Sequence, residues 1–145
     1  MSIIIFIIIL LVLVVVHEFG HYIVAKKNGI RVDEFGFGYP PRAMKLFRKW
    51  DTDFTLNWIP FGGFVKIYGE DPNDENTHGP DSHRAMVNKP ARVQAAVLVA
   101  GVVFNIILAW ILLSVGFMTG LPSTVTNDGM GKYVQNPELT ITQVM

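Results

Sequence analysis

Two histidines and a glutamate near the N-terminus have the residue types and the spacing needed for metal chemistry. His17-Glu18-Phe19-Gly20-His21 reads H-E-x-x-H. On a helix the two imidazoles project from nearly the same face, about 6 Å apart along the axis, so one cation can reach both. Glu18 is offset by about 100° and can meet a metal-bound water without being a ligand. The pattern predicts a Zn²⁺ site, with two neutral imidazoles on the ion and a carboxylate that takes a proton from water.

The alternative is that these are polar residues at the end of a helix, because so short a pattern also occurs by chance. An unbroken apolar run, Ile3 to Val16, precedes the motif. Burying two histidines and a glutamate in lipid costs at least a few kcal/mol unless they bind or pair, which favours the metal site. The chain has no cysteine, so a thiolate site and a disulfide framework are excluded.

The apolar residues form two blocks long enough to cross a membrane. As a helix, the stretch from Ile3 to Ala25 would span about 34 Å, against a hydrocarbon core of about 30 Å. A second block runs from Val93 to Met118. A cleaved signal peptide is the alternative for the first block, but no basic residue precedes Ile3 and no small-residue cleavage site follows Val16. The sequence predicts a mainly α membrane protein with two transmembrane helices.

Charge predicts the orientation of these helices. The net charge is zero, which argues against nucleic acid as a partner. Of the 12 Lys and Arg residues, all but Lys132 lie between Lys26 and Arg92. The positive-inside rule therefore places residues 26–92 in the cytoplasm and both termini outside. The metal site would then lie in the cytoplasmic third of the bilayer, reached by water through a cavity.

The segment between the helices is expected to form strands and turns at the membrane. Ile30 to Phe37 alternates loosely, and Gly38-Tyr39-Pro40-Pro41 should end that strand. Arg42 to Trp50 mixes basic and aromatic residues, which suits lipid headgroups or, equally, a solvated turn.

A hairpin of two further strands is expected just downstream. Asp53 to Ile59 sets Phe54, Leu56 and Trp58 against polar neighbours, as in a half-buried strand, and Pro60 to Gly63 reads as a turn before Phe64 to Tyr68. The open edge of such a hairpin would capture an unwound substrate as an added strand, or the hairpin would only fill the space between helices.

Polar residues lie in the following loop and inside the second helix. Gly69 to Asn88 is expected to be a mobile surface loop, whose His78 and His83 are not assigned to the metal. In the second helix Gly101, Asn105 and Ala109 share a face. Asn105 would either join the helices by a hydrogen bond or lie beside the metal, where it would bond substrate or orient a ligand.

These motifs together resemble the site-2 protease family of intramembrane zinc metalloproteases, in particular the bacterial PDZ-containing regulators of sigma-factor release. The motifs that carry the resemblance are His17 to His21, Ile59 to Lys66, Lys89-Pro90, and Ala100-Gly101 with Asn105. The resemblance implies that His17 and His21 bind zinc and that Glu18 is the catalytic base. It also implies peptide-bond hydrolysis in transmembrane segments of membrane proteins, an anti-sigma factor among them, at the bacterial inner membrane. Its implied substrate-binding residues are Gly62, Gly63, Phe64, Val65, Lys66 and Asn105.

Two departures from the family pattern shape the expectation. Val102 and Val103 stand where the family has a proline near the glycine equivalent to Gly101, and the Leu-Asp-Gly motif that supplies the third zinc ligand is absent. We therefore expect the N-terminal part of such a protease. Its expected parts are a first transmembrane helix at 1–25, a β-hairpin region at 26–68, a polar loop at 69–89, a second transmembrane helix at 90–119, and the start of a truncated PDZ-type region at 120–145.

Two alternatives remain. The chain could be a non-catalytic membrane binding module, or pseudoprotease, that holds a partner transmembrane segment. It could also be a two-span assembly protein whose H-E-x-x-H is accidental. A third zinc ligand would favour the protease over the binding module. Measured zinc that depends on His21 would rule out the accidental motif.

Overall fold

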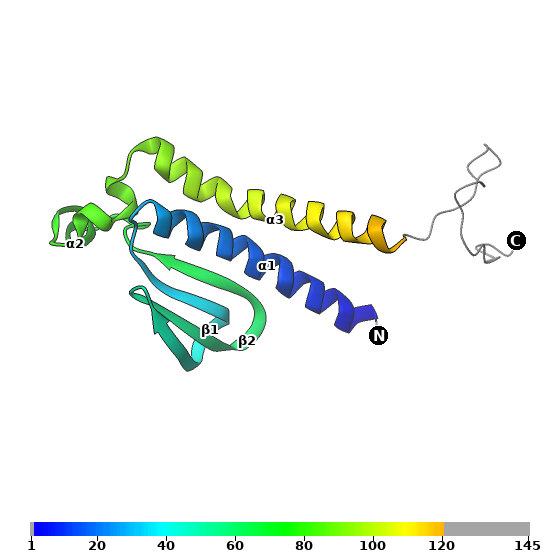
Figure 1. The fold of residues 1–145 in the computed structure, drawn as a ribbon. Coiled ribbons are helices and arrows are strands. Elements are labelled where there is room, and N and C mark those ends of the chain that lie inside the picture. The colour runs from blue at the N-terminus through cyan, green and yellow to red at the C-terminus, as the bar shows by residue number, and fades with distance from the viewer. Residues whose placement is uncertain (1, 121–145) are drawn as a thin grey trace, which may run out of the picture. The chain divides into compact units, whose positions relative to one another are not determined.

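The computed structural model describes residues 2–120. The predicted PDZ-type segment therefore lies outside the described residues, apart from residue 120. Along the chain, a strand region and a run of short helical turns lie between two long helices (Figure 1). The elements are α1 (Ser2–Lys27), β1 (Val32–Lys49), β2 (Thr52–Ile67), α2 (Asp74–His78), the 3₁₀ turns η1 (Ser82–Arg84) and η2 (Met86–Asn88), and α3 (Ala91–Thr119).

Both long helices are mostly apolar; α3 exposes most of its side chains, and α1 buries few of its own completely. Each is long and apolar enough to cross a membrane, α1 from Ile3 to Lys27 and α3 from Ala91 to Thr119. The last turn of α1 carries Lys26 and Lys27, and Pro90 directly precedes the first residue of α3. Such a proline has the φ angle of a helix start and lacks only a donor that would stay unpaired there. The prediction of two membrane-spanning helices with strands between them is confirmed.

The two strands form an antiparallel sheet in which β1 and β2 are each sharply bent. Phe35 pairs with Phe54 in the first half of β2 and also with Val65 in its second half. The first half of β1 is therefore flanked on both sides by β2. The predicted hairpin between 53–59 and 64–68 is wrong in its pairing, because both segments pair with β1 and not with each other.

The predicted strand breaks are wrong as well. Pro40 and Pro41 do not end the first strand, since β1 continues to Lys49 and the prolines lie at one of several register shifts, the one between Tyr39 and Arg42. The stretch 60–63 is likewise inside β2, where Gly62 has a φ of 91°. A positive φ is readily adopted by glycine alone, so this residue lets the strand bend without stopping.

The second strand alternates as predicted, but its buried face is the polar one. Thr55 and Asn57 are 0% and 4% exposed, whereas Leu56 and Trp58 are 42% and 72% exposed. The hydroxyl of Thr55 donates to Glu34 Oε1 over 2.6 Å, and Nδ2 of Asn57 donates to the Gly38 carbonyl over 3.1 Å. Apolar side chains facing outward suit a sheet that meets lipid, where the usual inside-outside rule for water does not apply.

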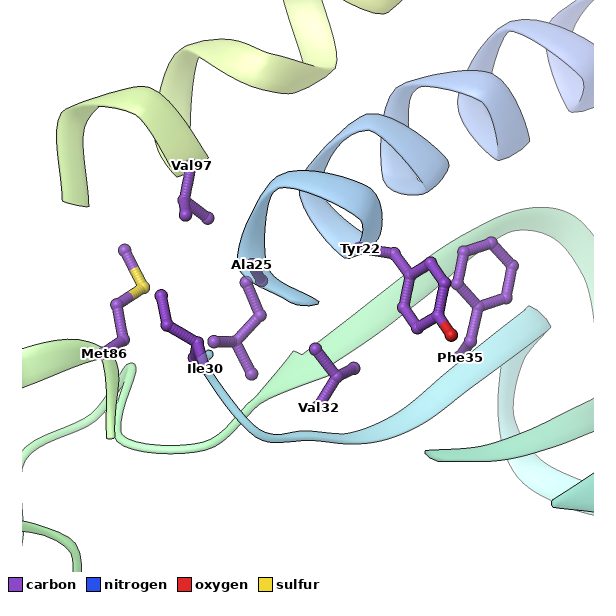
Figure 2. Close-up of a cluster of buried hydrophobic side chains, with 8 residues drawn as sticks. Tyr22, Ala25, Ile30, Val32, Phe35, Met86 and Val97 are labelled. Atoms are coloured by element: carbon purple, nitrogen blue, oxygen red, sulfur yellow. The ribbon is translucent and has the colours of Figure 1, made fainter. Parts of the chain in front are cut away.

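A small core joins the end of α1 to the sheet and to the start of α3 (Figure 2). Tyr22 lies against Phe35 with ring centroids 5.7 Å apart. The core fixes the half of α1 that carries the H-E-x-x-H motif against both neighbouring elements. Its buried members are Tyr22, Ala25, Ile30, Val32, Phe35, Ile67, Met86 and Val97.

Residues 69–89 are more structured than the predicted mobile loop. Asn73 and Asn76 form a reciprocal capping box at the start of α2. The Met86 amide donates to the Tyr68 carbonyl over 2.8 Å, and the Val87 amide donates to the Gly69 carbonyl over 3.0 Å. These backbone bonds hold η2 beside the end of β2 and so bring the polar segment close to α1.

Candidate metal centre and active site

The helices α1 and α3 pack closely together at two glycines. A Cβ atom on Gly20 would lie 2.6 Å from the Ala100 carbonyl oxygen, so α3 occupies the space that a side chain would need. Gly101, one residue further on α3, is buried against the face of α1 that carries His17 and His21. The absence of side chains at these two positions allows the imidazoles to lie directly against the backbone of α3.

The two imidazoles converge at Gly101. Their ring centroids are 4.8 Å apart and their planes are inclined by 77°. A Cβ atom on Gly101 would lie 2.5 Å from Nε2 of His17 and 2.6 Å from Nε2 of His21. Both Nε2 atoms therefore face one small space over the glycine. The helical prediction that His17 and His21 can reach one cation agrees with this geometry.

A backbone hydrogen bond fixes the tautomer of His21. Its Nδ1 lies 2.7 Å from the carbonyl oxygen of Val97. A carbonyl can only accept, so Nδ1 carries the proton and the lone pair of the neutral ring is on Nε2. This is the arrangement that a histidine ligand adopts when its second ring nitrogen is held by a backbone carbonyl.

The carboxylate of Glu18 faces the second half of β2. The backbone of Val65 lies beside this carboxylate. A Cβ atom on Gly63 would lie 3.9 Å from Cγ of Glu18, so the lack of a side chain there keeps the strand close to α1. Glu18 is half-buried between the helix and this strand, next to the two imidazoles and not pointing away from them.

Two pockets adjoin the site, and Glu18 lines both. A pocket of about 200 Å³ extends past His21 toward the 69–89 segment. A second pocket, of about 350 Å³, extends past His17 and Asn105 toward the N-terminal half of α1. Each is large enough to hold several water molecules. The first is lined by Glu18, His21, Val65, Ile67, Glu70, Met86, Val97 and Leu98, and the second by Leu13, Val14, His17, Glu18, Tyr39 and Asn105.

The side chains present fit a zinc ion in part. Two neutral imidazoles with converging Nε2 atoms and a nearby carboxylate are the donor set expected of the H-E-x-x-H half of such a site. Within residues 2–120, no group of three or more His, Cys, Asp or Glu side chains is placed to hold a metal. A catalytic zinc site needs a third protein ligand, and this part of the chain does not supply one.

The remaining predicted site residues are only partly brought together. Val65 lines the first pocket, and Asn105 lines the second with its Nδ2 3.5 Å from Nδ1 of His17. The Phe64 ring instead packs over Gly36, and Lys66 is exposed and lines neither pocket.

Sequence reasoning missed Glu70, which lines the first pocket with Glu18 and His21. The only signal was its place directly after the second strand. That signal was weak because the segment that follows is polar throughout.

Fold and site together define a membrane protein with two spans that carries an H-E-x-x-H motif where its helices cross. The sequence model for peptidase family M50 matches residues 5–144, and the chain belongs to this family. The site-2 protease resemblance is therefore confirmed.

Curated relatives agree with the family. A protein of Clostridium perfringens (strain 13 / Type A), named a candidate zinc metalloprotease, is 41% identical over 69% of this chain and 28% of its own length. The regulator of sigma-E protease RseP of Escherichia coli (strain K12) is 37% identical over 81% of this chain and 26% of its own length. A similarly named candidate zinc metalloprotease of Clostridium acetobutylicum is 30% identical over 86% of this chain and 34% of its own. The chain thus spans about a quarter to a third of the length of these relatives.

Proposed function

We propose that this chain forms the H-E-x-x-H half of the active site of a zinc metalloprotease that cleaves peptide bonds within transmembrane segments of membrane proteins. The observation that carries the proposal is the convergence of the two Nε2 atoms over Gly101, with the tautomer of His21 set by Val97. A third zinc ligand would come from outside residues 2–120.

The residues divide the chemistry between them. His17 and His21 would hold Zn²⁺, which, when bound, supplies Lewis-acid activation of water and of the peptide carbonyl. Glu18 takes a proton from the attacking water and then passes it to the leaving amine. The two pockets that Glu18 lines give water a route to the carboxylate from either side of the helix crossing.

The second half of β2 would present the substrate. A helical substrate must unwind first, because its carbonyls are held in backbone hydrogen bonds. An unwound segment can then add to the exposed edge of a sheet as another strand. Residues 63–67 are an outer strand of this sheet and touch Glu18 at Val65. In this proposal Gly62 to Lys66 bind substrate backbone, and Asn105 lies on the opposite side of the site.

We further propose that the protein resides in the inner membrane, with residues 26–92 on the cytoplasmic side. The placement of 11 of 12 basic residues in that segment supports this orientation. The proposed partner is a membrane protein that is cleaved in a transmembrane segment, and the name of the Escherichia coli relative, a regulator of sigma-E protease, supports an anti-sigma factor among the candidates.

The test measures zinc content and cleavage separately in the full-length protein. We expect about one zinc per chain in the wild type, loss of that zinc on His21→Ala, and loss of reporter cleavage with zinc retained on Glu18→Gln. Undiminished cleavage by the Glu18→Gln variant would overturn the proposal. Stoichiometric zinc without cleavage of any transmembrane reporter would favour the binding module, and no zinc in the wild type would favour an accidental motif.

A further inference from the structure

The unexplained feature of the site is the amide of Asn105. Its Nδ2 faces Nδ1 of His17 over 3.5 Å, while its Oδ1 is buried and has no hydrogen-bond partner. A buried amide oxygen without a partner is unfavourable, so the orientation of this amide needs an explanation. Rotation of the amide by 180° about Cβ–Cγ exchanges the two atoms in the same space and turns the oxygen toward the imidazole.

The chemistry of His17 decides between the two orientations. If Nδ2 donates to Nδ1, the proton of a neutral ring must lie on Nε2, and the lone pair then points away from Gly101. If Oδ1 accepts from Nδ1–H, the lone pair lies on Nε2, which faces the same space as Nε2 of His21. The second orientation gives the oxygen a partner and moves the Nδ2 group into the space that the oxygen leaves, and it matches the tautomer that Val97 sets for His21.

Val97, Gly101 and Asn105 are spaced by four residues and so share one face of α3. From this face a carbonyl contacts one imidazole, an amide contacts the other, and the glycine between them leaves room for both rings. We infer that Asn105 is a positioning residue which accepts a hydrogen bond from Nδ1 of His17 and thereby holds its Nε2 lone pair toward the metal. The inference rests on the proposed zinc site and deepens it.

Two substitutions at this position test the hydrogen bond. Asn105→Leu keeps the size of the side chain and removes the acceptor, whereas Asn105→Asp keeps an acceptor oxygen and removes the donor. Loss of such a partner of a ligating histidine typically lowers metal affinity about 10- to 100-fold. In the full-length protein we expect that loss for Asn105→Leu and an affinity within about threefold of the wild type for Asn105→Asp, measured by zinc competition with a chelator.

The second readout is the tautomer of His17, from ¹⁵N NMR of the metal-free protein. We expect Nδ1–H in the wild type and in Asn105→Asp, and a shift toward Nε2–H in Asn105→Leu. Ile106→Val, on the exposed face of the same helix, is the control and should change neither readout. Because this measurement needs no metal, it still tests Asn105 if the wild type proves to bind no zinc, an outcome that would defeat only the proposed function.

Three outcomes would overturn the inference. Unchanged affinity and tautomer in Asn105→Leu would show that the amide does not position His17. Equal loss in Asn105→Leu and Asn105→Asp would show that the amide acts as a donor. If Asn105→Leu lowers only the thermal stability, with zinc affinity and the His17 tautomer unchanged, Asn105 contributes to helix packing and does not position the ligand.

Discussion

At Gly101 a single methyl group decides whether the two imidazoles can share an ion. The Cβ atom of an alanine there would lie within 2.6 Å of both Nε2 atoms. We expect Gly101→Ala to lower zinc affinity at least tenfold, because the methyl group displaces the rings from the space that they face. Alanine also favours a helix over glycine by about 1 kcal/mol, so α3 itself should not be weakened.

Zinc content and helicity, measured on the same purified sample, check this prediction. Val102→Ala is the matched control, since its side chain is 53% exposed on the neighbouring face of α3. Full zinc binding by the Gly101→Ala variant would mean that the metal is held elsewhere.

Residues of the site differ in how far the sequence reveals them. His17, Glu18 and His21 were predicted because helical periodicity alone places their side chains together. Asn105 was predicted to lie near the first helix because it is four residues from Gly101, although its partner could not be chosen. The carbonyl of Val97 left no signal, since a backbone acceptor does not depend on the residue that carries it.

Among the elements, the crossing of α1 and α3 depends on Gly20. A Cβ atom there would lie 2.6 Å from the Ala100 oxygen and 3.0 Å from the Phe104 ring. We expect Gly20→Ala to lower the free energy of unfolding, because overpacking costs about 1–3 kcal/mol against about 1 kcal/mol gained in helix propensity. Unfolding in mixed detergent micelles measures it.

The control for this change is Val12→Ile, which adds one methylene where the side chain is 44% exposed on the same helix. Equal stability of the Gly20→Ala variant and the wild type would show that the helices do not pack at this glycine.

The basic half of β1 is tied to β2 through Asp53. Lys45 lies 2.6 Å and Arg48 3.5 Å from its carboxylate. The hydrogen bond from Lys45, with the charges of Lys45 and Arg48, holds the pKa of Asp53 below its ordinary value of 3.8. A lowered pKa means that the native state binds fewer protons, so this contribution is present above pH 3.8 and is lost as the pH falls through the lowered pKa.

We therefore expect the protection of amides in residues 42–55, taken relative to the intrinsic exchange rate at each pH, to fall on acidification below about pH 4 in the wild type. In the Asp53→Asn variant these amides should be less protected than in the wild type at neutral pH. Their protection should then not fall further on acidification. Asp74→Asn, which removes an equal charge outside the sheet, is the control. An identical acid response in Asp53→Asn would assign the effect to other groups.

The sheet shows where sequence reasoning stops. Strand residues were found because alternation is local, but pairing is not, and the partner of residues 64–67 lies about thirty positions earlier in β1. The inverted burial of Thr55 and Trp58 has the same origin, because alternation identifies two faces without saying which one is buried. The helices were predicted most accurately, since length and hydropathy alone define a span.

For the whole molecule, the main prediction is the side of the membrane on which the site opens. The chain has no cysteine, so single-cysteine variants give unambiguous labelling. Glu70 is exposed and lines the pocket that reaches Glu18 and His21. Glu70→Cys should react with a membrane-impermeant maleimide only from the cytoplasmic side, because the basic residues of 26–92 favour that side.

Thr119→Cys, at the far end of α3, is the complementary variant and should react only from outside. Preincubation with zinc should slow the labelling of Glu70→Cys if water and the ion use the same pocket to reach the imidazoles. Labelling of Glu70→Cys from outside the cell would reverse the proposed orientation while leaving the metal centre intact. If Glu70→Cys reacts from neither side, water does not reach the site through this pocket. The pocket beside His17 and Asn105 would then be the remaining path to Glu18 among the described residues.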